Sequence, residues 1–262
     1  MSNPTLINAN QTSRIVLVTG GSRGLGKATA LFLADKGMDV ILTYVNSSSA
    51  ADDVVKAIEA KGQKAASLQL DVEKSQQFKD FSAQVENLLA DKWQGQKLYG
   101  LINNAGIGIH ASFAETTEAQ FDQLMNIHLK APFFLTQTLL PLLADGGRII
   151  NLSSGLARFS LPGYAAYATM KGGVEVLTRY MAKEFGARGI SVNTIAPGAI
   201  ETDFGGGAVR DTPALNQFVA SQTALGRVGM PDDIGGAMAA ILLPESGWIN
   251  GQRIEASGGM FM

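Results

Sequence analysis

Tyr167 and Lys171 lie four residues apart in a segment, YATMKGGVEVLTRYMAKEF, that predicts a helix. Residues at i and i+4 share a helix face, with their Cβ atoms about 5–6 Å apart. An unperturbed tyrosine has a pKa near ~10, which is too high for acid–base chemistry at neutral pH. A neighbouring cation lowers that pKa by roughly three units at an effective dielectric constant of ~20. The pair therefore predicts a tyrosine that transfers a proton at neutral pH.

Ser154 precedes this helix and follows an apolar run, RIINLSS, that predicts a strand. A hydroxyl at the carboxyl end of a strand and a Tyr–Lys helix face can converge on one carbonyl oxygen. A Tyr–Lys pair alone is a weak signal, because such pairs often line a solvated helix face. Its weight comes from its combination with a glycine motif near the amino terminus.

That motif begins where the first predicted strand, residues 14–20, runs into GGSRGLGKATALFLADKG. Gly20, Gly24 and Gly26 follow a strand and open a helix, which is the context that raises such a pattern above chance. The glycines permit a tight turn, and the helix N-terminus offers free N–H groups to a phosphate. The alternative is an ordinary strand–helix turn with small residues for packing. We favour a dinucleotide site, because the motif lies in a predicted βαβ unit.

The second predicted strand, MDVILTY, ends at Tyr44 without the acidic residue that holds the adenosine ribose in folds that bind NAD. Arg23 lies in the glycine loop, and Ser47 follows the strand. These residues favour the 2′-phosphate of NADP(H) over NAD(H). The alternative is that Arg23 is simply a solvated loop residue.

Strands and helices alternate along the rest of the chain. Strands are expected to end near Asp71, at NNAG, at Ser154 and at Pro197, with GQRIEAS as the last. A long helix is predicted over residues 117–143, with Pro132 causing a local irregularity. The glycine-rich segment that follows the Pro197 strand suits a mobile lid over the site. We expect the substrate pocket to be bordered by this lid, residues 203–219, and by Phe159, Tyr164, Met170 and His110.

The alternation predicts an α/β fold with a doubly wound parallel sheet and helices on both faces. Ligands bind such sheets beyond the carboxyl ends of the strands, where the strand order reverses. Gly20, Asn104, Ser154 and Pro197 all lie at such ends. The predicted topology thus supports the same site independently of any motif.

Composition sets the outer limits. A flexible tail is predicted over residues 1–13, and residues 14–262 are expected to form one domain. The full chain has 46% hydrophobic and 17% charged residues, which suits a globular protein with a sizeable core. A net charge of −2 argues against nucleic acid and anionic membranes as partners. The chain has no cysteine and two histidines, so no metal site is expected. Without a signal peptide or an apolar run of ~18 residues, a soluble cytoplasmic protein is expected.

Together these residues resemble the short-chain dehydrogenase/reductase family, from TGGSRGLG through Asp71, NNAG, Ser154, YATMK and PGAIET to the final GG. The resemblance implies a Rossmann-type fold that binds NAD(H) or NADP(H). It implies that Tyr167 is the general acid/base, that Ser154 polarises the substrate oxygen, and that Lys171 lowers the pKa of the tyrosine and binds the nicotinamide ribose. The implied cofactor residues are Gly20, Ser22, Arg23, Gly24, Leu25, Gly26, Ser47, Asp71, Val72, Asn104, Ala105, Gly106, Tyr167, Lys171, Pro197, Gly198, Ile200 and Thr202.

Within that set, the resemblance places Asp71 at the adenine, Asn104 near the adenosine ribose and Thr202 at the carboxamide. It further implies an oxidoreductase that reduces a ketone or 3-oxo compound, or oxidises the corresponding secondary alcohol. A non-catalytic, dinucleotide-sensing regulator is the alternative, although such relatives usually lack the Tyr or the Lys. A homotetramer is also implied, and the apolar run PFFLTQTLLPLLA supports it because an exposed apolar patch marks an interface.

One position departs from the family pattern. Family members carry an Asn on the long helix, which supports a water relay to the lysine, and alignment through LKAPFF places His128 there. Asn126 lies two residues earlier and, turned by about 200°, should point elsewhere. His128 could be a tolerated substitute beside a free backbone carbonyl, a participant in the relay, or a packed residue without a role. We favour the first, because Pro132 predicts an irregular helix, and keep His128 with Ser154, Tyr167 and Lys171 in the candidate catalytic set.

Overall fold

The computed structural model describes residues 13–262. Residues 1–12, which make up nearly all of the predicted tail, lie outside the described residues. The described chain forms a seven-stranded sheet in the order β3-β2-β1-β4-β5-β6-β7, and every neighbouring pair is parallel. The strands are β1 (Arg14–Val18), β2 (Met38–Tyr44), β3 (Ala65–Gln69), β4 (Leu98–Asn103), β5 (Leu143–Leu152), β6 (Ser191–Pro197) and β7 (Arg253–Ala256).

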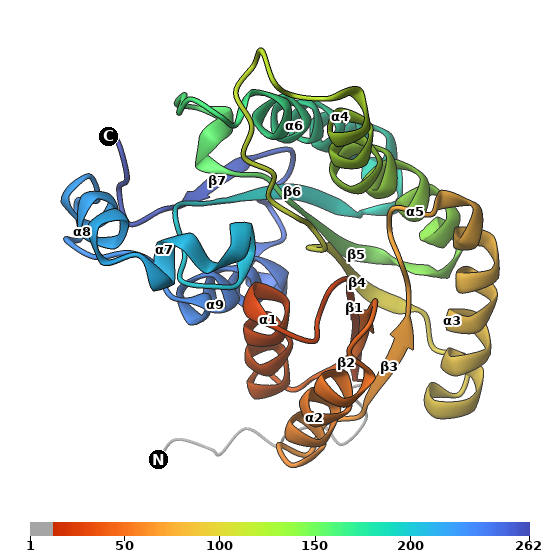
Figure 1. The fold of residues 1–262 in the computed structure, drawn as a ribbon. Helices are drawn as coiled ribbons and strands as arrows, with labels where there is room; N and C mark the ends of the chain where they lie inside the picture. Colours follow the sequence, from red (N-terminus) through yellow and green to blue (C-terminus); the bar gives the residue numbers. More distant parts are fainter. Residues whose placement is uncertain (1–12) are drawn as a thin grey trace.

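The strand order reverses between β1 and β4. The chain first winds outward from β1 to β3, and then starts again at β4 and winds the other way to β7 (Figure 1). This is the doubly wound Rossmann-type arrangement that the alternation predicted. The carboxyl ends of β1 and β4 are therefore the expected place for a dinucleotide.

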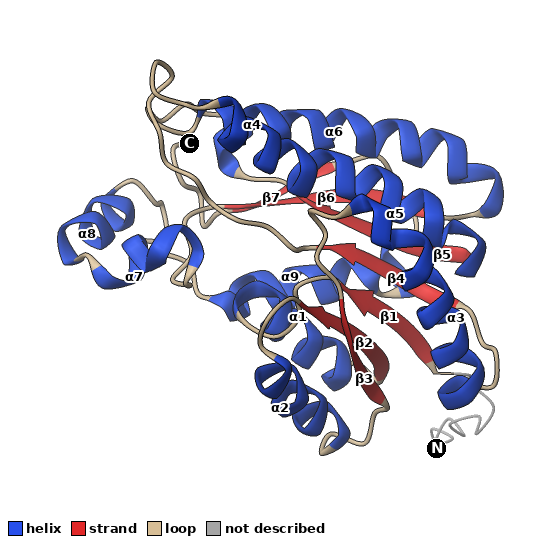
Figure 2. Cartoon of the chain, turned by 45° about the vertical axis from the view of Figure 1, so that its right-hand side comes forward, coloured by secondary structure: helices blue, strands red, loops and turns tan. Residues whose placement is uncertain are grey.

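Helices cover both faces of the sheet. Figure 2 shows α1, α2 and α9 on one face and α3, α5 and α6 on the other, with α7 and α8 set apart from both groups. No helix within residues 13–262 has the length and apolar character needed to cross a membrane. The helices are α1 (Gly24–Asp35), α2 (Ser48–Glu59), α3 (Phe78–Trp93), α4 (Glu118–Met125), α5 (Ala131–Leu139), α6 (Ala165–Phe185), α7 (Ala208–Asp211), α8 (Pro213–Ser221) and α9 (Pro231–Leu242).

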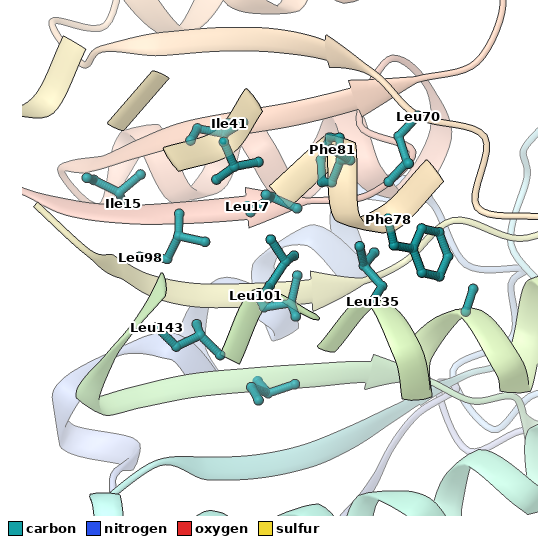
Figure 3. Packing of buried hydrophobic residues seen from close by; sticks show 14 of the residues in the cluster. Ile15, Leu17, Ile41, Leu70, Phe78, Phe81, Leu98, Leu101, Leu135 and Leu143 are labelled. Carbon is teal, nitrogen blue, oxygen red and sulfur yellow. The ribbon is translucent and has the colours of Figure 1, made fainter. Parts of the chain in front are cut away.

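The sheet separates two hydrophobic cores. Successive side chains of a strand point to opposite faces, so Ile15 and Leu17 of β1 enter the core under α3 and α5, which Figure 3 shows. Val16 and Val18 enter the core under α1 and α9. Both faces are covered, which is why the strands read as continuous apolar runs. The two cores fix the sheet and, with it, the strand ends that carry the polar residues.

The long helix predicted over residues 117–143 is interrupted in the middle. Between α4 and α5 lies a π-helical turn over Asn126–Lys130, in which the backbone hydrogen bonds reach one residue further than in an α-helix. Pro132 follows directly and has no N–H to donate to the carbonyl of His128, four residues earlier. The predicted irregularity is present, as a π turn just before the proline.

The end predicted for this helix was wrong. Leu143 is the first residue of β5 and not the last residue of the helix. Pro141 removes a backbone N–H from the final turn, so the chain tightens into a 3₁₀ turn over Leu140–Leu142 and the helix stops. The predicted strand accordingly begins earlier than GRIINLSS, and it ends at Leu152.

The predicted lid follows β6 and contains α7 and α8. Gly205 and Gly206 begin it with φ angles of 59° and 75°, in the left-handed region that favours glycine. The glycine run thus makes a sharp turn before α7. The mobility of this segment stays a prediction.

Candidate active site

The glycine-rich turn joins β1 to α1. Gly20 and Gly24 have φ angles of 66° and 53°, which a residue with a side chain rarely adopts. Gly26 has no space for a side chain, because a Cβ there would collide with the carbonyl of Gly20 and lie 2.7 Å from Asn104 Nδ2. The first turn of α1 carries no acidic residue, so its positive end is not neutralised. The turn thus has the backbone geometry and the helix end that a pyrophosphate group needs.

Asn104 fastens the NNAG segment to this turn. Its Nδ2 donates to the carbonyls of Thr19 at 2.8 Å and Gly20 at 3.2 Å. Thr19 Oγ1 in turn accepts the N–H groups of Asn104 at 2.9 Å and Ala105 at 3.0 Å. The amide of Asn104 therefore holds the glycine turn, and its place near the adenosine ribose stays a prediction.

The other residues expected at the cofactor follow the ends of β1, β2, β3, β4 and β6. Asp71 comes after β3, where it accepts the N–H of Glu73 at 3.1 Å and pairs with Lys74 at 3.1 Å. Thr202 lies beside the glycine turn, since its Cγ2 is 3.7 Å from the place of a Cβ on Gly24. The remaining members at this edge of the sheet are Ser22, Arg23, Leu25, Ser47, Val72, Ala105, Gly106, Pro197, Gly198 and Ile200.

Arg23 lies at the start of α1 and reaches toward the lid. Its Nη1 is 3.6 Å from Oδ2 of Asp203, and the two side chains are 78% and 51% exposed. Such an exposed pair contributes little to stability, so the guanidinium remains available to a ligand. Residues 44–49 carry no carboxylate, and Ser47 is exposed at the start of α2. This donor set fits a 2′-phosphate and hence NADP(H).

Tyr167, Lys171 and Ser154 meet at the carboxyl end of β5. Tyr167 and Lys171 are 6% and 3% exposed on the inner face of α6. Lys171 Nζ donates to the carbonyl of Leu152 at 2.6 Å and lies 5.5 Å from the centre of the Tyr167 ring. Ser154 Oγ accepts the N–H of Leu156 at 3.2 Å, and the Ser154 side chain lies close enough to the Tyr167 hydroxyl to lower the pKa of the tyrosine. The structure brings together the three side chains that the sequence analysis singled out.

Burial dominates the electrostatics of these groups. It raises the pKa of Tyr167 above its usual range, and the nearby Ser154 side chain opposes the rise only in part. Burial lowers the pKa of Lys171 to about 7. A lysine that is partly neutral at pH 7 exerts a weakened field, so the expected lowering of the Tyr167 pKa by Lys171 is not found in this structure. Tyr167 is a protonated acid here, and Lys171 is the group that titrates near neutral pH.

His128 lies in the π turn and packs against the NNAG segment. It is 2% exposed, and its Nε2 donates to the carbonyl of Ile107 at 2.8 Å. Its ring stands edge-on to that of Tyr167, with centroids 5.1 Å apart, and a Cβ on Gly106 would lie 2.7 Å from its Cε1. Burial and the charge of Lys171 lower the pKa of His128 well below its usual value, so the ring is neutral. Its Nδ1 is buried and finds no hydrogen-bond partner among the described residues.

Phe204 of the lid covers Tyr167, with ring centroids 5.6 Å apart and ring planes at 61°. Gly108 makes this contact possible, because a Cβ there would lie 2.7 Å from Phe204 Cε1. His110 and Tyr164, both expected at the pocket, contact each other edge-on at 5.0 Å. A shallow concavity beside the tyrosine is lined by Ile109, Ala111, Thr116, Leu124, Gly163, Ala166 and Tyr167.

Phe159 and Met170, also expected at the pocket, each pack in a hydrophobic cluster. Phe159 packs against Phe261, with ring centroids 4.7 Å apart, in a cluster that includes residues of the lid helix α8. Met170 is 2% exposed and belongs to the core beside Tyr167. Residues 13–262 contain no group of three or more His, Cys, Asp or Glu side chains that could hold a metal ion.

The sequence analysis missed a group of charged residues behind Ser154. They come from the turn after β5, from α6 and from β7, and interact as a chain: Arg158, Glu175, Arg253 and Glu255. The available signal was that Glu175 follows Lys171 by one helical turn and so shares its face.

A doubly wound sheet with a glycine turn, and a buried tyrosine beside a lysine and a serine, define a dinucleotide-dependent oxidoreductase. A family model described as enoyl-(acyl carrier protein) reductase matches residues 20–261. The chain belongs to the short-chain dehydrogenase/reductase family, as the motifs indicated.

Relatives and solved structures agree over nearly the whole chain. A hydroxynaphthalene reductase-like protein, Arp2 from Metarhizium brunneum, is 34% identical over 258 residues, which cover 94% of this chain and 94% of that protein. The promiscuous reductase LugOII, which catalyses keto-reduction at C1 during lugdunomycin biosynthesis, has a TM-score of 0.89 and 38% identity, covering 95% and 97% of the two chains. The angucycline C-6 ketoreductase LanV with bound NADP has a TM-score of 0.90 and 33% identity, covering 95% and 96%.

Proposed function

We propose that this protein is an NADP(H)-dependent ketoreductase in which residues 14–262 act as one cofactor-binding and catalytic domain. One observation carries the proposal: Tyr167 is buried, beside the Ser154 side chain and on the same face of α6 as Lys171. All three lie at the sheet edge that also carries the glycine turn. The three relatives reported above are named as reductases, so the regulatory alternative has no support.

The bound cofactor supplies a hydride to the carbonyl carbon. Tyr167 keeps its proton because burial raises its pKa, and it delivers that proton to the carbonyl oxygen as a general acid. Ser154 donates a hydrogen bond to the same oxygen as negative charge develops on it. Lys171, with a pKa of about 7, can return a proton to Tyr167 after each turnover. In alcohol oxidation the same groups act in reverse.

The substrate we propose is a cyclic ketone of the aromatic polyketide type. One relative is named a hydroxynaphthalene reductase-like protein, and one solved neighbour is named an angucycline C-6 ketoreductase. Around Tyr167 this chain presents flat side chains, with Phe204 above it and the His110–Tyr164 pair near the shallow concavity. Aromatic rings prefer to contact other rings edge-on or offset, so such a site suits a planar fused-ring ketone.

We propose NADP(H) as the preferred cofactor. The exposed guanidinium of Arg23 and the hydroxyl of Ser47 can contact a 2′-phosphate, and no carboxylate follows β2 to repel it. A neighbour that contains bound NADP, the ketoreductase LanV, supports the same choice.

We further propose a homotetramer that works in the cytoplasm on a small-molecule substrate. The support is an apolar surface on two helices that pack on the same face of the sheet, with Phe133 44%, Phe134 42%, Val176 46% and Tyr180 66% exposed. Exposed apolar groups of this kind mark interfaces. Light scattering at micromolar concentration tests the assembly, and a monomer there would overturn it.

The test of function is a panel of fused-ring and simple ketones, assayed by loss of NADPH absorbance with wild type and Tyr167→Phe. The variant keeps the ring and loses only the hydroxyl. We expect NADPH affinity to stay within about twofold while kcat falls by about 10²–10⁴, the usual contribution of general acid catalysis. Tyr180→Phe, on the exposed face of the same helix, is the matched control and should retain full activity. Near-normal turnover by Tyr167→Phe would exclude this tyrosine as the proton donor.

A further inference from the structure

A chain of alternating charges runs behind the segment that carries Ser154. It passes from Glu175 on α6 to Arg253 and Glu255 on β7, and from there to Arg158 in the turn after β5. Their side chains are 15%, 22%, 22% and 37% exposed, in that order. These groups are more buried than ordinary surface ion pairs, so solvent screens their interactions less.

Two members of this chain hold the serine segment: Glu175 binds the side chain of Ser153, and Arg253 binds the backbone of Ser154. Glu175 Oε1 accepts the hydroxyl of Ser153 at 2.6 Å and the Nε–H of Arg253 at 2.7 Å. Arg253 Nη2 donates to the carbonyl of Ser154 at 3.3 Å, and its Nη1 donates to Glu255 Oε2 at 2.8 Å. The guanidinium thus joins one helix, one strand and the serine segment.

The far end of the chain holds the same segment four residues later. Arg158 donates two hydrogen bonds to Glu255, at 2.8 Å and 2.7 Å. It also donates to the carbonyls of Met260 at 2.8 Å and Phe261 at 3.0 Å. Burial alone would raise the pKa of Glu255, but hydrogen bonds from Arg158 and Arg253 lower it to about 2, so the carboxylate stays charged. The turn after Ser154 is therefore fixed at both ends by charge-assisted bonds.

The serine segment forms a short 3₁₀ turn, which Ser154 caps with its side chain. The N–H of Ala157 donates to the carbonyl of Ser154 at 3.1 Å, and the charged residues add to these bonds beside a glycine. Gly155 follows Ser154 directly and has no room for a side chain, since a Cβ there would lie 2.8 Å from Phe159 Cε1. A glycine leaves the backbone free to rotate, and a rotation beside Ser154 would carry its hydroxyl away from Tyr167. A displacement of about 1 Å in a catalytic group can cost about 10²-fold in rate.

We propose that Arg253 and Glu175 are positioning residues that hold the Ser154 hydroxyl toward Tyr167, an inference that rests on the proposed function of Ser154. Neither charged group is expected to touch the substrate. Their effect on the reaction passes through the serine backbone, and it should therefore disappear when the serine hydroxyl is removed.

The test is a double-mutant cycle with Arg253→Met and Ser154→Ala, assayed by NADPH absorbance. We expect Arg253→Met to lower kcat by about tenfold to 10²-fold and to leave the Kd for NADPH within about twofold of the wild-type value. Arg253→Lys should recover part of the loss in kcat, because lysine keeps the positive charge but lacks the several donors of the guanidinium. In the Ser154→Ala background the Arg253→Met change should lower kcat by less than about twofold. Glu175→Gln, which is nearly isosteric, should give a smaller loss in the same pattern if Arg253→Met fails to fold.

Arg188→Met is the matched control, because Arg188 also pairs with a carboxylate, of Asp145, and donates to two backbone carbonyls. It lies outside the site and should change stability but not kcat. Amide hydrogen exchange gives a readout that needs no turnover. The amides of residues 153–159 should exchange at least about tenfold faster in Arg253→Met than in wild type, and at the wild-type rate in Arg188→Met.

Equal losses of kcat from Arg253→Met with and without Ser154, or unchanged exchange over residues 153–159, would overturn the positioning role. A Ser154→Ala variant with normal kcat would instead overturn the function proposed for Ser154, and the positioning role with it. The two failures are thus distinguished by the single variants.

Discussion

The ring of Phe204 lies edge-on over the ring of Tyr167, with centroids 5.6 Å apart. Phe204 belongs to the lid and is 44% exposed, whereas Tyr167 is 6% exposed. The lid thus places one half-exposed aromatic side chain directly above the buried phenol, where a planar substrate would have to enter.

This contact predicts that Phe204→Ala lowers the catalytic efficiency for fused-ring ketones. Loss of one aromatic contact should lower kcat/KM by about threefold to tenfold for fused-ring ketones and by less for a small aliphatic ketone. Phe218→Ala, also in the lid and 50% exposed, is the control and should leave both values unchanged. Equal losses for both ketone classes would mean that Phe204 shields the site without contacting the substrate ring.

The pair between Arg23 and Asp203 makes a prediction about the cofactor. Arg23→Ala should weaken NADPH binding by about tenfold and leave NADH binding unchanged, because only NADPH carries the 2′-phosphate. Asp203→Asn should tighten NADPH binding by about threefold, since the carboxylate no longer competes for the guanidinium. Fluorescence titration of both cofactors measures these constants. Equal wild-type affinities for NADPH and NADH would contradict the assignment of Arg23.

The neutral, buried ring of His128 predicts that it adds no ionisation to the reaction. His128→Asn, which restores the residue typical of the family, should change kcat by less than about fivefold. The pH–rate curve should keep its shape between pH 5.5 and 7.5, roughly the range in which a histidine titrates. The same curve for His110→Asn reports on the other histidine. An ionisation lost only in His128→Asn would make this residue a participant in proton transfer.

Lys171 carries a prediction about stability. Burial lowers its pKa to about 7, against about 10.4 in an unfolded chain. The cost of burying its charge is therefore complete below pH 7 and shrinks as the pH rises toward 10.4. Lys171→Met should raise the free energy of unfolding more at pH 6 than at pH 9, by about 2 kcal/mol.

Urea denaturation at the two pH values measures this difference. Lys183→Met, at an exposed position of the same helix, should show no such pH dependence. A Lys171→Met effect that is the same at pH 6 and pH 9 would mean that the lysine keeps an ordinary pKa in the folded protein.

Local patterns predicted most of the fold and the central triad, because their signals are short in sequence. The spacing of Tyr167 and Lys171 placed both on one helix face, and apolar runs located the strands. Contacts between distant segments gave no such signal: Arg253 and Glu175 are 78 residues apart and meet only because β7 lies behind α6. The lowered pKa of Lys171 could not be predicted either, because the spacing of residues shows which groups are neighbours but not how deeply they are buried.

The bonds from Asn104 to the glycine turn could not be predicted from the sequence for a related reason. A side-chain amide after a strand can face a ligand or its own backbone, and the carbonyls of Thr19 and Gly20 became its partners only once β1 and β4 were side by side. The end of the long helix was a simpler error. Pro141 is a helix-ending signal in the sequence, but the apolar pattern continues past it into β5, and the helix was therefore predicted to be too long.

The π turn over Asn126–Lys130 amounts to one inserted residue in an otherwise continuous helix. A π turn holds about one residue more than an α turn, so it absorbs the extra residue, and the helices before and after it keep their relative faces. Leu124 packs beside Tyr167, and Leu135 packs in the main core of the sheet. A single-residue deletion in this turn should therefore restore a uniform α-helix and leave both leucines in their cores. Its effect should instead fall on His128 and the other residues of the turn, whose side chains would change direction.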